Sequence, residues 1–289
     1  MAWYLVFDIG ATSVKYCWMN EIGQISAFNN FSSEGKDGSS ILESIKELIL
    51  QNKDKVSGVA ISSAGIIDST EGKIIKSGAF QDLQDKHIKN WMGDIVPELK
   101  VTIENDGNCA VYAEKWLGEA KELDNFISIS IGTGVGGGIF LNGKLYRGSE
   151  LMTGEFGSIY TQSMSGTSKL NSISGIKGVR RRYAAYLGIE MEEVSGEEIF
   201  YKYGQGDYGL DRIVSDFYSG LALFISNLHF IINPERIIIN GGITLSETFL
   251  PMLTSHLKLY GYNDASAICI SPLKNRANLV GALYYHLNE

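Results

Sequence analysis

The stretch FISISIGTGVGGGIFLNG, residues 126–143, decides the fold of this chain. Residues 126–131 have the pattern of a β-strand. A glycine-rich turn follows over residues 132–138, and a second strand ends at Asn142-Gly143, a dipeptide that favours a tight hairpin. The stretch therefore predicts two strands joined by a turn that exposes bare backbone.

A similar stretch, LVFDIGAT at residues 5–12, lies near the start of the chain. An apolar strand again meets a glycine turn, here at Gly10, and a second strand begins near Val14. Gly10 and Gly132 are interpreted as counterparts, so the chain is predicted to be an internal duplication of one strand–turn–strand core.

Strand and helix patterns alternate around these two turns. Further strands are expected at 24–28, 57–62, 99–103 and 237–239, and helices at 41–49, 110–117, 178–187, 210–232, 245–257 and 277–287. Residues 164–174 are rich in Ser, Thr, Gly and Asn and are expected to form a loop. This order predicts an α/β fold with mixed sheets.

Length and composition limit the class of protein. A chain of 289 residues predicts about two domains. Its net charge of −8 disfavours nucleic-acid binding, and the basic cluster Arg180–Arg182 is interpreted as one solvated helix face. No apolar run is long enough to span a membrane, and the N-terminus lacks the basic region of a signal peptide. Three scattered cysteines favour a reducing cytoplasm.

Gly132, Gly134 and Gly137 satisfy the dinucleotide-binding pattern G-x-G-x-x-G. That fingerprint requires a helix directly after the glycines, whereas a strand follows here, so a Rossmann site is disfavoured. A glycine-rich hairpin can still hold a phosphate, because its backbone N–H groups approach the anion closely. The alternative is a plain tight hairpin.

Asp8 lies at the end of an otherwise apolar strand, beside the first glycine turn. A carboxylate there could hold Mg²⁺ through water, the usual coordination of that ion. Thr12 could donate its hydroxyl to a phosphate, and Lys15 could add positive charge, although a surface lysine is equally expected. The alternative for Asp8 is a turn-forming aspartate.

Asp106 lies in Asn105-Asp106-Gly107, and Asp-Gly is a common turn dipeptide. A strand precedes this segment and a helix follows it, so Asp106 lies at the carboxyl end of a strand, where α/β sheets bind ligands. A carboxylate at that place could accept the proton of an attacking hydroxyl during phosphoryl transfer.

Two further segments carry weaker signals. Glu155 lies between Gly154 and Gly157 in a shaped loop, where an acceptor carboxylate would suit a polyol. Gly241-Gly242 follows a strand and precedes an expected helix, which would let a flat ring lie against bare backbone.

Taken together, these segments resemble the ROK family of sugar kinases and repressors, within the actin-like ATPase superfamily. The resemblance covers nearly the whole chain. It implies two actin-like (ribonuclease H-like) lobes with an interlobe cleft: a sugar-binding lobe of residues 1–115 and 275–289, and a nucleotide-binding lobe of residues 116–274. It also implies ATP and Mg²⁺ as cofactors, a sugar as substrate, and a homodimer.

The resemblance assigns roles to individual residues. Asp106 would be the general base for a sugar hydroxyl, usually the 6-hydroxyl. Asn105 and Glu155 would hold ring hydroxyls, Gly65 would shape the pocket wall, and Ser158 would line the pocket. The residues expected to contact the nucleotide and its Mg²⁺ are Asp8, Gly10, Thr12, Lys15, Gly132, Thr133, Gly134, Gly241 and Gly242.

Three departures from the family pattern matter. Ser158 stands where many members have histidine, residues 162–174 contain no cysteine or histidine, and residues 168–171 contain no acid. We therefore expect no structural zinc and a sugar pocket that lacks two usual contacts. Such a pocket could admit a glycoside or disaccharide as readily as glucose. Glucose, N-acetylmannosamine, fructose and a β-glucoside all stay open.

The leading prediction is a cytoplasmic, ATP-dependent carbohydrate kinase. Repressors of the family carry a helix-turn-helix before the first phosphate segment, and none is expected here. The alternative is a non-catalytic sugar sensor of the same fold, which the altered region around Ser158 favours. Both glycine turns and Asp106 argue against it, because a sensor has less need of phosphate clamps and a base.

Overall fold

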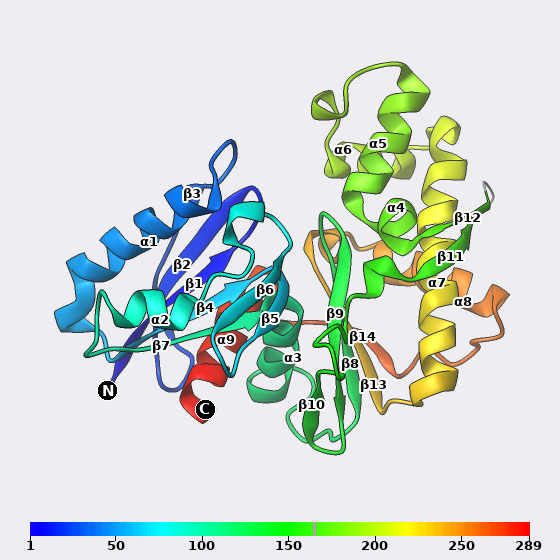
Figure 1. Ribbon diagram of the computed structural model, residues 1–289. Coiled ribbons are helices and arrows are strands. Elements are labelled where there is room, and N and C mark those ends of the chain that lie inside the picture. Colours follow the sequence, from blue (N-terminus) through cyan, green and yellow to red (C-terminus); the bar gives the residue numbers. More distant parts are fainter. Residues whose placement is uncertain (164–165) are drawn as a thin grey trace. The chain divides into compact units, whose positions relative to one another are not determined.

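The computed structural model describes residues 1–163 and 166–289. It divides into two compact units, and each is considered by itself (Figure 1). Unit 1 comprises Met1–Glu122, Leu145–Met152 and Arg276–Glu289, and unit 2 comprises Leu123–Lys144 and Thr153–Asn275. The lobes expected from the family differ from these units at residues 116–122 and 145–152, which cluster with unit 1, and at residue 275, which clusters with unit 2.

Unit 1 is built on a mixed five-stranded sheet in the order β3-β2-β1-β4-β7. β1 pairs antiparallel with β2, and β2 with β3, whereas β1, β4 and β7 run parallel. The strands are β1 (Trp3–Ile9), β2 (Ser13–Asn20), β3 (Ile25–Ser32), β4 (Gly58–Ser63) and β7 (Lys100–Asn105). The carboxyl ends of the three parallel strands therefore meet at one edge.

Unit 2 repeats this plan, with the strand order β10-β9-β8-β13-β14. β8 pairs antiparallel with β9, and β13 runs parallel to both β8 and β14. The strands are β8 (Phe126–Ile131), β9 (Val135–Leu141), β10 (Lys144–Tyr146), β13 (Arg236–Asn240) and β14 (Ile268–Ile270), and of the edge strand β10 only Lys144 is counted in unit 2. The equivalent orders confirm both the internal duplication and the mixed-sheet α/β fold.

Helices complete the core of unit 1. Helix α1 (Gly38–Asn52) buries its apolar face in the same hydrophobic cluster as alternate residues of β1, β4 and β7. Helices α3 (Asp106–Trp116) and α9 (Ala277–Asn288) pack closely, since a Cβ at Gly281 would lie 1.7 Å from the carbonyl oxygen of Cys109. The hairpin β5 (Gly65–Asp68) and β6 (Lys73–Ser77) and the short helix α2 (Ile88–Gly93) were not predicted.

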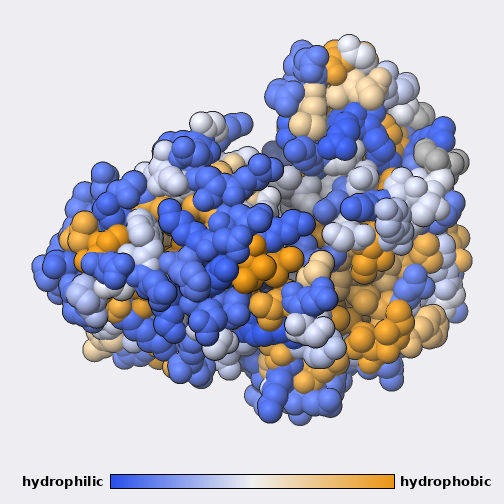
Figure 2. Space-filling model, in the orientation of Figure 1, coloured by the Kyte–Doolittle hydropathy of each residue, from blue (hydrophilic) through white to orange (hydrophobic). Residues whose placement is uncertain are grey.

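The core of unit 2 forms around α7 (Asp211–Ile232), whose apolar side chains pack with those of β8 and β13. The remaining helices of this unit include α5 (Ile176–Leu187), α6 (Gly196–Gly204) and α8 (Phe249–Leu259). Within residues 1–163 and 166–289, no helix is both long and apolar enough to cross a membrane. The face of the molecule seen in Figure 2 is mostly hydrophilic, with smaller apolar groups between.

The prediction of a loop at residues 164–174 is wrong for residues 166–174. Residues 164–165 lie outside the described part of the chain. Strand β12 (Gly166–Lys169) pairs antiparallel with β11 (Tyr160–Ser163), and α4 (Leu170–Ser174) follows directly. Leu170 and Ile173 are buried, and Ser174 Oγ donates to the carbonyl oxygen of Phe217 at 2.9 Å. Tertiary packing against α7 thus orders a sequence whose composition is typical of a loop.

The interpretation of Arg180–Arg182 as one solvated face is also wrong. Arg180 donates to the carbonyl oxygens of Val194, at 2.6 Å, and Met191, at 3.0 Å. Arg182 Nη1 lies 3.2 Å from Asp216 Oδ2, whose side chain is buried. Burial lowers the pKa of Arg182, which Asp216 partly opposes. Of the three arginines only Arg181 is exposed.

Candidate active site

The predicted residues of unit 1 meet at the carboxyl edge of its parallel strands. Ile9 is in register with Ser63, and Ser63 with Asn105. The segments after these three residues therefore leave the sheet side by side. This edge gathers Asp8, Gly10, Gly65, Asn105 and Asp106, as expected for a ligand site in an α/β sheet.

Asp8 is 5% exposed, and its carboxylate is held by neighbours on three elements. Oδ1 accepts from Ser62 Oγ at 2.9 Å and from Asn278 Nδ2 at 3.1 Å. Lys15 Nζ lies 3.5 Å from Oδ2. A single carboxylate in this setting suits Mg²⁺ bound through water, because that ion keeps several of its water ligands in proteins.

The first glycine turn is closed by its own backbone. Gly10 N–H donates to the carbonyl oxygen of Ser13 at 3.1 Å, and a Cβ at Gly10 would lie 3.0 Å from that oxygen. Ser33 Oγ donates to the Gly10 carbonyl at 2.7 Å, and Ser33 N–H to the Thr12 carbonyl at 3.2 Å. These bonds fix the turn and leave Thr12 exposed.

Asn105 caps helix α3, which starts at Asp106 rather than at residue 110 as predicted. Asn105 Oδ1 accepts from Asn108 N–H at 2.9 Å, so the amide satisfies a free donor of the first helical turn. Asp106 is the first residue of the helix, where the helix dipole stabilises a negative charge. Its Oδ1 accepts from Gly107 N–H at 2.9 Å and from Asn105 Nδ2 at 3.1 Å.

Gly65 meets the same amide from the neighbouring strand. Asn105 Nδ2 donates to the Gly65 carbonyl at 2.8 Å. Gly65 has φ +124°, and a Cβ there would lie 2.3 Å from the carbonyl oxygen of Lys76. Only glycine fits this position, so the wall expected at Gly65 is bare backbone joined to the Asn105–Asp106 segment.

Sequence reasoning assigned no role to an ion pair beneath this segment. Glu104 is fully buried. Its Oε1 accepts from Asn105 N–H at 2.7 Å and from Asn108 Nδ2 at 3.0 Å. Its Oε2 lies 2.5 Å from Arg147 Nη2 and forms an ion pair with that arginine. Burial lowers the pKa of Arg147, but the hydrogen bond and charge of Glu104 outweigh it, so the pKa is raised. Arg147 also donates to the Tyr112 hydroxyl at 3.3 Å, and burial raises the pKa of Tyr112 to about 12.

The predicted residues of unit 2 meet at the equivalent edge of the second sheet. β8 and β13 are parallel, with Asn240 in register with Ser130, so both glycine turns leave the sheet at the same end. Gly241 has φ +117°, and a Cβ there would lie 1.9 Å from the Ile131 carbonyl oxygen. The Gly241-Gly242 turn thus lies against the strand end that leads into Gly132.

The Gly132–Gly134 turn is held by the first residues of α5. Gly132 N–H donates to the Gly134 carbonyl at 2.9 Å. Ile176 N–H donates to the Gly132 carbonyl at 3.0 Å, and Lys177 N–H to the Thr133 carbonyl at 3.1 Å. A Cβ at Gly132 would meet no atom within 4 Å, so this glycine faces open space.

Glu155 and Ser158 are both exposed and belong to one tight turn, whose residues 156–158 form a 3₁₀ helix. Gly154 has φ +96°, and a Cβ there would lie 2.1 Å from the Gly137 carbonyl oxygen. The turn is therefore seated on the glycine-rich strand β9. This arrangement places both predicted sugar contacts of unit 2 on one rigid support.

The sequence resemblance led us to expect no structural zinc, and residues 162–174 were the stretch concerned. In the described part of the chain, no three His, Cys, Asp or Glu side chains are grouped so that they could hold a metal ion. The hairpin β11–β12 and helix α4 occupy this stretch and pack on α7. Thr161 Oγ1, for example, donates to the Gly220 carbonyl at 3.4 Å.

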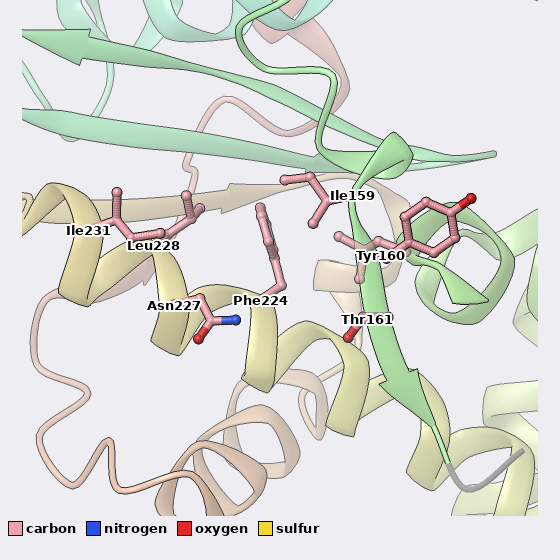
Figure 3. Close-up of a pocket in the computed structure, with 8 residues that line it drawn as sticks. Ile159, Tyr160, Thr161, Phe224, Asn227, Leu228 and Ile231 are labelled. Atoms are coloured by element: carbon pink, nitrogen blue, oxygen red, sulfur yellow. The ribbon is translucent and has the colours of Figure 1, made fainter. Parts of the chain in front are cut away.

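A pocket of about 180 Å³ lies between β11 and α7 (Figure 3). Its lining is mostly apolar and comprises Ile159, Tyr160, Thr161, Leu170, Phe224, Asn227, Leu228 and Ile231. None of the predicted site residues lines this pocket, so it is separate from the chemistry considered above.

Comparison with known proteins identifies the family. Residues 4–289 match the model of the ROK family. A β-glucoside kinase of Listeria monocytogenes is 38% identical over 287 residues, covering 98% of this chain and 97% of its own length. A β-glucoside kinase of Klebsiella pneumoniae is 34% identical over 287 residues, covering 98% of this chain and 95% of its own.

Among solved structures, a protein from Listeria monocytogenes described as a candidate N-acetylmannosamine kinase has a TM-score of 0.90 and 37% identity, and the match covers 99% of this chain and 98% of that one. A ROK family protein from Streptococcus pneumoniae in complex with sucrose has a TM-score of 0.84 at 23% identity, covering 99% and 98%. The fold and the matched length agree. This chain belongs to the ROK family.

Proposed function

We propose that this chain is an ATP-dependent carbohydrate kinase that phosphorylates a hydroxyl, the 6-hydroxyl, of a β-glucoside. The observation that carries the proposal is the position of Asp106 at the start of α3. Its carboxylate is oriented by Gly107 N–H and by the capping Asn105, at the sheet edge that also holds Asp8. The relatives named as sugar kinases support the reaction class.

In this reaction the sugar hydroxyl attacks the γ-phosphorus of ATP while the Asp106 carboxylate accepts its proton. The new oxygen–phosphorus bond forms as the bond between the γ-phosphorus and the bridging oxygen breaks, and ADP leaves. Asp106 is the first residue of α3, where the helix dipole favours a negative charge. Asn105 Nδ2 donates both to the Gly65 carbonyl and to Asp106 Oδ1, which orients the carboxylate.

We assign the nucleotide to the glycine turns. Gly132–Gly134 would take the phosphates, and Gly241-Gly242 would receive the adenosine. Bare backbone at these turns permits close approach, and the N-terminus of α5 holds the carbonyl groups of the Gly132–Gly134 turn. Mg²⁺, when bound, would neutralise phosphate charge, and Asp8 is the residue that would hold it through water.

The preference for a β-glucoside over free glucose rests on the pocket residues. Ser158 is a small, exposed side chain where many ROK members have histidine, and residues 168–171 provide no acid. Fewer contacts to the sugar leave room for a second ring or an aglycone. The named β-glucoside kinases, 34% and 38% identical to this chain, support this choice.

The test is ADP release in a coupled assay with Mg-ATP and a panel containing glucose, N-acetylmannosamine, fructose, cellobiose and an aryl β-glucoside. We expect release with the β-glucosides and none with Asp106→Asn. Activity confined to free monosaccharides, with glycosides neither reacting nor competing, would refute the β-glucoside assignment. ADP binding without transfer to any sugar would favour the non-catalytic sensor instead.

We also propose that the protein works as a homodimer in the cytoplasm. Phe230 and Ile231 at the end of α7 are 74% and 75% exposed, which suits burial against a second chain. Cys17, Cys109 and Cys269 form no disulfide within residues 1–163 and 166–289, which suits a reducing compartment. Sedimentation velocity would test the dimer, and fractionation of the source cells would test the location.

A further inference from the structure

The side chain of Asn171 in unit 2 contacts two turns. One is the Gly132–Gly134 turn, here called the phosphate turn, and the other is the turn of residues 154–158 that carries Glu155 and Ser158, here called the sugar loop. Asn171 Oδ1 accepts from Val135 N–H at 2.6 Å, directly after the Gly132–Gly134 turn. A Cβ at Gly134 would lie 2.7 Å from the same oxygen, and a Cβ at Gly157 would lie 2.0 Å from it. Asn171 therefore fills the space that both glycines leave open.

We infer that Asn171 is a positioning residue that couples the phosphate turn to the loop carrying Glu155 and Ser158. This inference rests on the proposed function for the identity of the two ligands. The neighbouring backbone supports the same role, because the Asn171 carbonyl accepts from Gly175 N–H at 3.2 Å, just before the first turn of α5. Lys177 of that turn donates to the Thr133 carbonyl, so α4 and α5 together hold the phosphate turn.

The coupling has a mechanical basis. A side chain at Gly157 would displace the Asn171 amide, since its Cβ would lie 2.2 Å from Cγ and 2.4 Å from Nδ2. Displacement breaks the bond to Val135 N–H and frees the strand end that shapes the phosphate turn. A change in the sugar loop should therefore reach the nucleotide through Asn171.

The experiment measures ADP affinity by calorimetry, and sugar KM by the coupled assay, for full-length variants. Gly157→Ala should weaken ADP binding about tenfold, the usual effect of one lost hydrogen bond, and Asn171→Ala should do the same. The double variant Gly157→Ala/Asn171→Ala should bind ADP as Asn171→Ala does, because the atoms that clash are already gone. Sugar KM should follow the same non-additive pattern.

Two further variants make the test decisive. Asn227→Ala, an exposed asparagine on α7 (Figure 3), is the matched control and should bind ADP as the wild type does. Asn171→Asp keeps the acceptor for Val135 N–H, so its melting temperature should match the wild type and exceed that of Asn171→Ala. Its added charge should weaken ADP binding more than adenosine binding.

The inference is overturned if Gly157→Ala binds ADP like the wild type, or if the effects of Gly157→Ala and Asn171→Ala multiply in the double variant. A wild-type chain that binds ADP and sugar but transfers no phosphate refutes the proposed kinase while leaving this coupling open to the same binding measurements. If Asn171→Ala does not fold, Gly134→Ala with Asn171→Asp supplies the comparison. The single variant Gly134→Ala should bind ADP more weakly than the wild type, because its Cβ would lie 2.7 Å from Asn171 Oδ1. If Gly134→Ala binds ADP as tightly as the wild type, the coupling is contradicted.

Discussion

Arg147 Nη2 lies 2.5 Å from Glu104 Oε2, and the two residues are 43 positions apart in the sequence. Glu104 immediately precedes the Asn105–Asp106 segment and is fully buried, whereas the Arg147 side chain is 25% exposed. The ion pair ties the segment Leu145–Met152 into unit 1. The carboxylate that supports the proposed base is therefore paired with a cation from a distant part of the chain.

Removal of the arginine should destabilise unit 1 strongly. Arg147→Met leaves the Glu104 charge buried and uncompensated, and loss of one partner from a buried pair costs about 3 kcal/mol or more. Urea denaturation should show this loss, and Glu104→Gln/Arg147→Met should recover a large part of it because the charge has gone. A double variant no more stable than Arg147→Met would contradict the assignment of the cost to an unpaired charge.

The two halves of this ion pair show what the sequence could and could not predict. The motif around Asp106 was recognised because its residues are contiguous, and the structure places them at a sheet edge as expected. Arg147 lies outside every motif, and no local pattern links it to Glu104. The start of α3 was predicted four residues late, because the capping role of Asn105 was not recognised in a dipeptide context typical of a turn.

The loop prediction for residues 166–174 was wrong for a different reason. Their Ser, Thr and Gly content has no helical or strand periodicity, yet Leu170 and Ile173 are buried in unit 2. Such packing depends on α7, which lies about 40 residues further along the chain. Asn171 was missed for a similar reason, because its partner Val135 lies 36 positions away in the sequence.

The proposed base gives a prediction about turnover. Asp106→Asn keeps the size of the side chain and its place at the start of α3 but removes the proton acceptor. We expect kcat to fall by about 10²-fold or more, the usual contribution of general base catalysis, with ADP affinity unchanged. The coupled assay and calorimetry test this, with the melting temperature as the check on folding. Turnover near the wild-type rate would remove the base assignment.

The open sugar pocket gives a prediction about specificity. Ser158→His adds an imidazole to the exposed 3₁₀ turn at residues 156–158. The larger side chain should fill the space used by the second ring or aglycone and add a contact to the sugar. We expect the ratio of kcat/KM for cellobiose to that for glucose to fall about tenfold, the effect of roughly 1.4 kcal/mol. An unchanged ratio would mean that Ser158 does not line the sugar pocket.

His286 gives a prediction about pH and stability. It is 3% exposed, its Nδ1 lies 3.0 Å from Thr102 Oγ1, and burial, with a smaller effect of Lys100, lowers its pKa from 6.5 to about 4. Tyr4 packs edge-on against the ring. Below pH 6.5 the unfolded chain binds a proton that the folded chain does not, so stability falls as pH falls toward 4.

The expected loss from His286 between pH 7 and pH 5 is about 2 kcal/mol in the free energy of unfolding. Urea denaturation at several pH values measures it. In His286→Asn, whose amide can still bond to Thr102, this part of the pH dependence should disappear, although the variant should be less stable at pH 7. Parallel pH profiles for the two proteins would show that His286 titrates normally.

Alanine substitutions at two neighbouring glycines of unit 2, Gly241 and Gly242, should have different effects on stability. Gly241 has φ +117°, and a Cβ there would lie 1.9 Å from the Ile131 carbonyl oxygen, so Gly241→Ala should cost about 2 kcal/mol or more of stability. A Cβ at Gly242 would meet no atom within 4 Å. Gly242→Ala should therefore keep the stability of the wild type within about 0.5 kcal/mol.

The same pair tests the proposed adenosine site. If a flat ring lies against Gly242, a methyl group there should weaken ADP binding about tenfold or more through loss of close contact, although the fold is intact. Thermal denaturation and calorimetry of the two variants separate the effects. A Cβ at Gly242 would project into open space, where the ring is proposed to lie. A Gly242→Ala variant that binds ADP like the wild type would therefore show that the ring does not contact Gly242. The adenosine would then have to bind elsewhere on unit 2.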